Sequence, residues 1–366
     1  MNFRHALLYT FTSKYLLLLI QFGSTLILSR LLTPADIGIY TIAYSIVSIG
    51  HVFRDFGVGN YIHQEKDLTT DRIRAAMTIT LFFAWCMCLA LYFGADYAAQ
   101  FYNEEGIKKV FQVLALNFFL IPFGSVTTSY IRRNMRFKFV MKLEVLCSLI
   151  STATVISLAY LGFSYMSMAW SSVAGIVFEI TILTAYRPKE LPFLPGIKQL
   201  KHVLGFSTLS VAESLLSQLG SFLPDLIIGK VLGMHSVGIL SRAKGTIGLF
   251  DRAVTSAIEP VLLPYFSKEN RAGENIKESF LHITMCVTGL VWPALVYMLI
   301  MAEPLILTLY GEQWIESAFL LQILCIRQLI IRLVAFIHPV LMSKGKIKIL
   351  LQLQIFFVPL EIIVIL

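Results

Sequence analysis

Apolar stretches alternate with short polar breaks along almost the whole chain. An α-helix needs about 20 apolar residues to cross the hydrocarbon core of a bilayer, and eleven stretches come close to that length. They lie at roughly 7–30, 37–60, 75–95, 110–131, 143–161, 165–186, 203–230, 236–262, 280–301, 318–342 and 349–366. The pattern therefore predicts an all-α polytopic membrane protein, whose first stretch is an uncleaved helix because no small-x-small cleavage site follows it.

Two segments that lie two hundred residues apart carry the same pattern. Residues 26–43 and 226–243 are identical at six of eighteen positions without a gap. In each copy an apolar run ends in one cation, Arg30 or Lys230, and a Gly-Ile step at Gly38 or Gly238 begins the next run. Duplicated bundles that face each other across a central site are a common transporter architecture. We therefore expect two pseudo-symmetric helical lobes, six helices followed by at least five, around a central cavity.

A proline-rich and charged segment divides the two predicted lobes. Residues 187–196 contain three prolines and cannot continue a helix. We place the N-terminal lobe at 1–186, a cytoplasmic linker at 187–201, and the C-terminal lobe, with helices 7–11, at 202–366. Because a twelfth helix would complete the symmetry, we expect the chain to be a truncated form of a longer protein.

Composition and charge agree with a membrane protein. Hydrophobic residues make up 57% of the chain, charged residues 14%, and the mean hydropathy is +0.75, whereas about a quarter of the residues are charged in soluble domains. With a cytoplasmic N-terminus, nineteen basic residues fall on the inner side and four on the outer side, as the positive-inside rule describes. The net charge of +8 then follows from topology, so no nucleic-acid partner is needed.

Motifs for enzymatic or metal chemistry are absent from the sequence. The five cysteines lie inside apolar runs without Cys-x-x-Cys spacing, which favours buried packing residues over disulfides or metal ligands. The sequence contains no phosphate-binding P-loop, no His-Glu-x-x-His and no Gly-x-Ser-x-Gly motif. We therefore predict a protein that is not an enzyme and that holds no metal or cofactor.

Seven cations remain inside the predicted helices after the loops are assigned. They are Lys14, Arg54, Arg242, Lys244, Arg252, Arg327 and Arg332. Each would cost about 2.5–3.5 kcal/mol at the centre of a lipid-facing helix, so we expect them to face a polar interior. Lys14 and Arg54 lie toward helix ends, where long side chains can extend to the surface. A cationic cavity suits an anionic ligand, and arginine binds phosphate in a bidentate manner.

Polar residues recur at helical spacing on the predicted helices one, two, seven and eight. Helix eight carries Lys244, Gly248, Asp251, Thr255 and Glu259, and helix two carries Tyr44, Ser48, His51, Asp55 and Gly59 at positions two hundred lower. These stripes are interpreted either as a cavity lining or, for the small residues, as helix-packing seams.

Acids accompany the cations on these helices. Asp55, Glu213, Asp225 and Asp251 have two interpretations: structural partners that neutralise cations, or protonatable groups that couple transport to an ion gradient. The sequence alone does not distinguish between these two interpretations.

Several short motifs resemble a known family. They are 31–40 (LLTPADIGIY), 53–59 (FRDFGVG), 225–233 (DLIIGKVLG), 259–267 (EPVLLPYFS) and 309–314 (LYGEQW). Together they resemble bacterial polysaccharide exporters of the Wzx type, which share a superfamily with multidrug exporters of the MATE class and lipid II flippases. The chain departs from the family at Gly238-Ile-Leu240, where Gly-x-Tyr is usual.

The resemblance implies a multi-pass flippase of the bacterial inner membrane. Such a protein moves undecaprenyl-diphosphate-linked oligosaccharide outward by alternating access, in contact with membrane lipid and with polysaccharide polymerase machinery. We expect the diphosphate among Arg252, Arg327 and Arg332, with the other four cations lining the route. A MATE-like exporter of small cations should have an acidic, aromatic cavity, and a glycan polymerase or ligase should carry a sizeable outer loop. The sequence shows neither feature, so the flippase is favoured.

Overall fold

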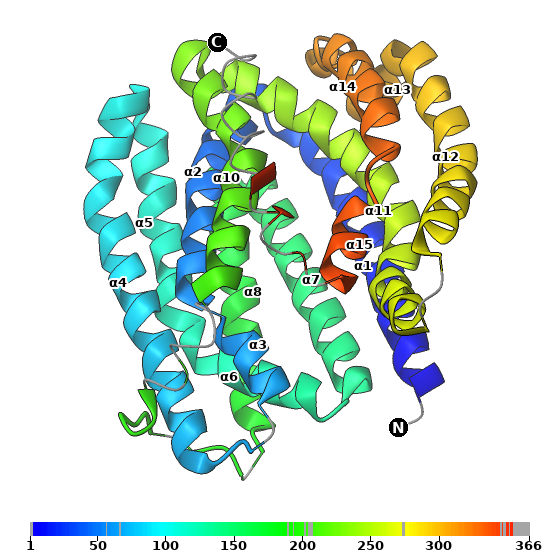
Figure 1. Cartoon of the computed structure of the whole chain (residues 1–366). Coiled ribbons are helices and arrows are strands. Elements are labelled where there is room, and N and C mark those ends of the chain that lie inside the picture. The colour runs from blue at the N-terminus through cyan, green and yellow to red at the C-terminus, as the bar shows by residue number, and fades with distance from the viewer. Residues whose placement is uncertain are drawn as a thin grey trace.

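The computed structural model describes residues 3–55, 57–65, 67–188, 190–192, 194–200, 203, 208–272, 275–344, 346, 349–350 and 352–353. Within these ranges the chain is built from helices, turns and loops, without a strand. Figure 1 shows the long helices standing side by side and running between two ends of one bundle. We call the end that holds the turn between α1 and α2 the outer end, and the opposite end the inner end, after the predicted orientation.

We group the helices by the predicted division of the chain into two lobes. The first lobe comprises α1 (Phe3–Leu31), α2 (Pro34–Asp55), α3 (Val58–Gln64), α4 (Thr70–Tyr102), α5 (Glu105–Leu120), α6 (Pro122–Arg133), α7 (Phe137–Tyr160) and α8 (Met166–Ala185). The second lobe comprises α10 (Thr208–Val231), α11 (Gly233–Ala272), α12 (Ile276–Ile300), α13 (Ala302–Tyr310), the 3-10 helix η1 (Glu312–Trp314), α14 (Ser317–Arg332) and α15 (Ile337–Ser343).

The predicted spans correspond closely to these helices. Seven described helices are long and apolar enough to cross a membrane, and an eighth is added if α5 and α6 form one bent span. The long helices α10 and α11 are not among the seven, because they carry several of the charged residues discussed above. The predicted all-α membrane fold is confirmed, whereas most of the last predicted span, 349–366, lies outside the described residues.

Three predicted helices are interrupted. The stretch 37–60 breaks at Gly57, whose positive φ of 69° ends α2 before α3 begins. Gly59 of the predicted helix-two stripe therefore lies on α3 instead of α2. The stretch 110–131 bends by 53° between α5 and α6, where Pro122 lacks the amide hydrogen that a continuous helix needs. The stretch 318–342 separates into α14 and α15.

The turn between α1 and α2 forms through local hydrogen bonds. The Asp36 amide donates to the Thr33 hydroxyl over 3.2 Å, and the Thr33 amide donates back to the Asp36 carboxylate over 3.0 Å. This reciprocal arrangement is a capping box, and Pro34 supplies the fixed φ that the first helical turn favours. The outer hairpin is consequently tight.

Apolar packing joins α1 to the second lobe. Leu32 is buried in the same apolar cluster as Phe266, Leu295 and Trp314, which belong to α11, α12 and η1. A separate cluster joins α2, α4, α5 and α8 around residues such as Ile42 and Phe118. The outer end of α1 thus packs on the core of the second lobe, although it belongs to the first lobe by sequence.

Candidate functional site

The two copies of the sequence repeat touch each other at the outer end. A Cβ added at Gly38 would lie 1.8 Å from the Met234 carbonyl oxygen, and one added at Gly238 would lie 1.8 Å from the Pro34 carbonyl oxygen. Positions 34 and 234 are equivalent in the repeat, as are 38 and 238, so the contact is reciprocal in the way of a two-fold interface. At this crossing α2 and α11 meet backbone to backbone, and only glycine fits.

A hydrogen bond continues this contact one turn toward the inner end. The Thr41 hydroxyl donates to the Ser241 hydroxyl over 3.3 Å, and these two residues are again two hundred positions apart. Both α10 and α11 pack along α2. The two lobes are therefore closed against each other at the outer end in this structure.

Side chains of the second lobe cap the outer end of α1. The Trp314 indole donates to the Ser29 carbonyl over 2.7 Å, and the Gln313 amide donates to the same oxygen over 2.5 Å. The last carbonyl groups of a helix have no partner within the helix, so these two donors satisfy one of them. The motif at 309–314 thereby ties α1 to the second lobe.

Arg242 lies among the aromatic side chains of the same motif. Its guanidinium carbon is 4.4 Å from the ring centre of Trp314 and 4.9 Å from that of Tyr310. Such positions are stabilised by attraction between a cation and the face of an aromatic ring. The Tyr310 hydroxyl also shares a hydrogen bond of 3.0 Å with Thr246. Arg242 is only 7% exposed, so it belongs to the packed outer part of the second lobe.

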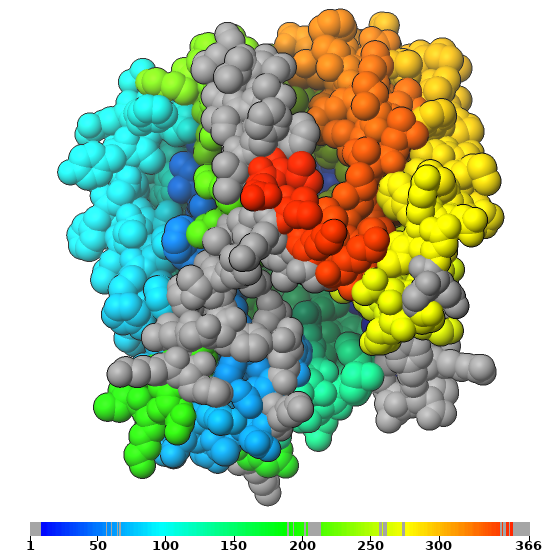
Figure 2. All heavy atoms as spheres, viewed as in Figure 1, coloured from blue at the N-terminus to red at the C-terminus, as the bar shows by residue number. Residues whose placement is uncertain are grey.

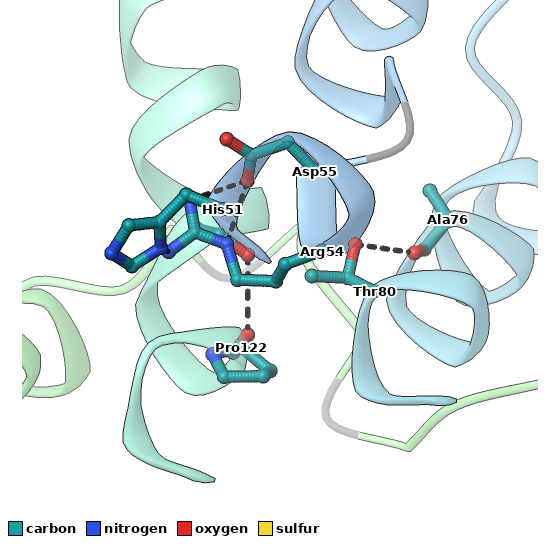
Figure 3. A network of polar contacts seen from close by, with 7 residues as sticks. His51, Arg54, Asp55, Ala76, Thr80 and Pro122 are labelled. Carbon is teal, nitrogen blue, oxygen red and sulfur yellow. Dashed lines mark hydrogen bonds and ion pairs between the residues drawn. The ribbon is translucent and has the colours of Figure 1, made fainter. Parts of the chain in front are cut away.

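Two other predicted cations contact carboxylates of the predicted stripes. Lys244 Nζ lies 2.8 Å from Asp225 Oδ1, and Arg54 Nε donates to Asp55 Oδ1 over 2.8 Å. Arg54 also contacts His51 Nδ1 over 2.9 Å, as Figure 3 shows. Asp225 and Asp55 are therefore each paired with a neighbouring cation in this conformation.

The three deep arginines lie on α11 and α14. Arg332 forms an ion pair with Asp251, and the Gln328 amide donates to the same carboxylate over 3.1 Å. Arg252 and Arg327 are next to these residues in sequence, and their side chains are exposed. Arg252, Arg327 and Arg332 thus lie on two helices that pack against each other.

The remaining predicted residues are Lys14 and Glu213. Lys14 is half-buried on α1, beside Tyr15, whose hydroxyl donates to the Ala253 carbonyl over 3.1 Å. This contact brings α1 to α11 next to Arg252. The Glu213 side chain lies outside the described residues, although its backbone belongs to α10.

Two of the three helix breaks adjoin a pocket that contains a predicted arginine. In the first lobe, Arg54, Ser125, Thr128, Arg132 and Glu179 help to line a pocket of about 290 Å³ beside the α5–α6 bend. In the second lobe, Arg332 lines a pocket of about 360 Å³ beside the α14–α15 break. Broken helices at matching places in two repeats often mark binding sites in transporters.

Glu179 is a candidate that the sequence reasoning missed. It is the one charged residue of the apolar span α8, and it lies near Arg54, Arg132 and Glu144. A carboxylate within a membrane span is costly and marks a functional site by default. The isolated acid in 165–186 was the available signal, although it belongs to neither of the repeated polar stripes.

The inner end of the first lobe is positively charged. Arg133 donates to the Ile62 carbonyl over 2.5 Å, and Arg132 pairs with Glu144 over 2.7 Å. The pKa of the nearby His63 is lowered, first by burial and then by the charges of these two arginines. His63 therefore adds little positive charge near neutral pH.

The fold defines the class of protein to which the chain belongs. The structure matches the lipid II flippase MurJ in its inward closed conformation with a TM-score of 0.77, covering 98% of this chain and 80% of that chain at 14% identity. The chain is thus a multi-pass helical membrane protein with this fold. Residues 27–319 match the family of polysaccharide biosynthesis proteins, and the chain belongs to that family.

Several relatives extend along most of the chain. The teichuronic acid biosynthesis protein TuaB of Bacillus subtilis is 21% identical over 92% of this chain and 70% of its own length. The lipopolysaccharide biosynthesis protein WzxC of Escherichia coli is 22% identical over 90% of this chain and 68% of its own length.

The name of a third relative states a transport activity. The succinoglycan biosynthesis transport protein ExoT of Rhizobium meliloti is 23% identical over 81% of this chain and 60% of its own length. The resemblance inferred from the short motifs is confirmed by these matches. The proteins whose names state an activity are a transporter and a flippase, in agreement with the prediction that the chain is not an enzyme.

Proposed function

We propose that the protein is a flippase that moves undecaprenyl-diphosphate-linked oligosaccharide across the bacterial inner membrane. The placement of Arg327 and Arg332 inside an apolar span, packed against the helix that carries Arg252, is the observation that carries the proposal. Arg327 and Arg332 lie on α14, inside the apolar span Ser317–Ser343. Guanidinium groups at that depth are expensive against lipid, and a diphosphate would supply the matching negative charge.

These three arginines suit a ligand that must be bound and released. Asp251 holds Arg332 in place, whereas the exposed side chains of Arg252 and Arg327 would contact the diphosphate. Arginine can bind phosphate oxygens in a bidentate manner. Lys14, Arg54 and Lys244 would line the route, and Arg242 would support its outer part from the aromatic motif.

Alternating access would use the contact between the repeat copies. In the present conformation the lobes are closed at Gly38 and Gly238, and outward release requires α2 and α11 to separate there. The proposed orientation has a cytoplasmic N-terminus, so substrate enters from the inner end. Asp55, Glu213, Asp225 and Asp251 remain candidates for ion coupling, and Glu179 joins them. Polysaccharide polymerase machinery would receive the product.

Complementation of a strain that lacks its own flippase tests the proposal. Arg252→Gln and Arg327→Gln should each abolish surface polysaccharide while the amount of protein in the membrane stays normal. Lys109→Gln is the matched control, because Lys109 is an exposed cation at the outer end of α5. Normal polysaccharide in both arginine variants would refute the site, and failure of the native chain to complement would refute the proposed function.

A further inference from the structure

The pocket beside the α5–α6 bend contains a carboxylate without a direct partner. Glu179 of α8 lines this pocket of about 290 Å³ together with Arg54 of α2 and with Ser125, Thr128 and Arg132 of α6. Among the described residues, none forms a hydrogen bond or an ion pair with Glu179, and neither of its carboxylate oxygens is enclosed by the protein. The carboxylate is therefore available to a ligand in the pocket.

The charged groups around the pocket disfavour an ionic ligand. Arg54 Nε donates to Asp55 Oδ1 over 2.8 Å, and Arg132 pairs with Glu144 over 2.7 Å. Because each arginine already has an acidic partner, Glu179 adds one negative charge that these four residues do not balance. Repulsion from this charge disfavours an anion, and two guanidinium groups beside a single carboxylate disfavour a metal cation.

The pocket offers both hydrogen-bond donors and acceptors. A guanidinium group has five N–H donors, and Arg54 uses three of them, two on Asp55 and one on His51. The hydroxyl groups of Ser125 and Thr128 donate to carbonyl groups of their own helix, so the hydroxyl oxygens can still accept from a ligand. A ligand in this pocket therefore needs both donor and acceptor groups.

Adjacent hydroxyl groups on a sugar ring meet this requirement. A hydroxyl can donate to a carboxylate and accept from a guanidinium at the same time, without bringing a charge of its own. Ile121, Ile176 and Ile180 add apolar walls, which can pack on the C–H groups of the ring. Ligand pockets typically measure about 300–1,000 Å³, so a pocket of about 290 Å³ suits one sugar residue rather than an oligosaccharide.

Helices that line the proposed route also support this pocket. The Ser13 hydroxyl of α1 donates to Glu144 of α7 over 2.9 Å, so the carboxylate that holds Arg132 is itself held by α1. Ser13 is next to Lys14, one of the cations assigned to the route. Figure 2 shows α7, in teal, between α3, in blue, and α15, in red, in this view. The pocket is therefore connected to the helices along which the oligosaccharide would move.

We propose that this pocket binds one uncharged sugar residue of the substrate, whose hydroxyl groups donate to Glu179 and accept from Arg54 and Arg132. This proposal rests on the proposed function, because it names the part of the substrate that the first lobe recognises. The diphosphate stays with the arginines of the second lobe. Glu179 then determines specificity, because its charge admits a neutral sugar and rejects a uronic acid.

Protection of a thiol in the pocket wall tests this assignment on the purified full chain in detergent. Thr128→Cys, made without the five native cysteines, is alkylated with N-ethylmaleimide. The probes are the methyl glycosides of glucose, galactose, mannose, rhamnose and N-acetylglucosamine, and at least one should slow the reaction at least threefold. Ser129→Cys is the matched control, because Ser129 is the adjacent residue but does not line the pocket, and its rate should not change.

Two variants show whether the protection depends on the pocket. Glu179→Leu removes the carboxylate acceptor, and Ile180→Trp fills the pocket without changing its charge, so each should abolish the protection. Val177→Trp is the matched control for size, because Val177 lies on the same helix, is 46% exposed and does not line the pocket. Protection that persists in Glu179→Leu or in Ile180→Trp would overturn the proposal.

Charged probes test the expected selectivity. Methyl glucuronide and inorganic phosphate should each require at least a tenfold higher concentration than the best neutral glycoside for equal protection. Equal protection by either anion would identify an anion site and overturn the proposal. Absence of protection by every neutral glycoside would overturn it as well.

The complementation assay separates this proposal from the broader one. A native chain that complements, while no glycoside protects Thr128→Cys, would remove the sugar pocket and leave the flippase intact. A chain whose pocket is protected by a neutral glycoside, but which does not complement, would remove the flippase instead.

Discussion

The close crossing of α2 and α11 predicts that the Gly238→Ala substitution forces these two helices apart. The new methyl group would lie 1.8 Å from the Pro34 carbonyl oxygen and 2.6 Å from its carbon. These are backbone atoms, so no side chain can rotate away. Close contacts between carbon and carbonyl oxygen have separations of about 3.3 Å or more, and the helices must therefore move apart by about 1.5 Å.

The expected change in the ratio of closed to open molecules follows from the free-energy cost of overpacking. Extra methyl groups in a well-packed region typically cost about 1–3 kcal/mol. If the crossing exists only when the outer end is closed, that cost lowers the ratio of closed to open molecules on the order of ten- to a hundredfold, because about 1.4 kcal/mol corresponds to a factor of ten. The higher helix propensity of alanine acts in both conformations and cancels from the ratio.

Thiol labelling from the outer aqueous side measures this ratio. A Thr41→Cys variant, made without the five native cysteines, places a thiol directly beside Ser241. A membrane-impermeant maleimide should label it on the order of ten- to a hundredfold faster when Gly238→Ala is also present. Gly248→Ala is the control on the same helix, because nothing lies within 4 Å of its added Cβ.

Two outcomes would refute this reasoning. Equal labelling rates in the Gly238→Ala and native backgrounds would mean that the crossing does not close the outer end. Equal acceleration by Gly248→Ala would mean that helix propensity, rather than the crossing, controls access. Gly38→Ala should reproduce the acceleration, because its added Cβ would be equally close to the Met234 carbonyl oxygen.

Two further predictions concern single side chains. Trp314→Phe removes the hydrogen bond to the Ser29 carbonyl and should lower the free energy of unfolding in detergent by about 0.5–1.5 kcal/mol. Trp170→Phe, at a site that is 39% exposed, should cost less, and equal losses would contradict the capping role. Glu179→Gln should flatten the pH dependence of translocation in proteoliposomes without changing the amount of folded protein, because the carboxyl group that could exchange a proton is gone. An unchanged pH profile would exclude Glu179 from coupling.

Hydrophobic patterning was sufficient to predict the helices. Length and mean hydropathy are local properties of the chain, and ten of the eleven predicted spans coincide with a described helix or a broken pair. The repeat also predicted the equivalence of Gly38 and Gly238. The breaks were harder to predict, because Gly57 lies inside an otherwise apolar stretch and its positive φ depends on how α2 and α3 pack.

The partners of the polar residues were decided by the tertiary structure. The sequence identified Arg242, Arg332 and the motif at 309–314, but it could not show that Trp314 caps α1 from 285 positions away. Such contacts depend on which helix faces pack together, and many arrangements satisfy the same apolar pattern. Insertion into lipid is determined residue by residue along the chain, whereas charge pairing and the pocket behind Arg332 exist only once the helices are assembled.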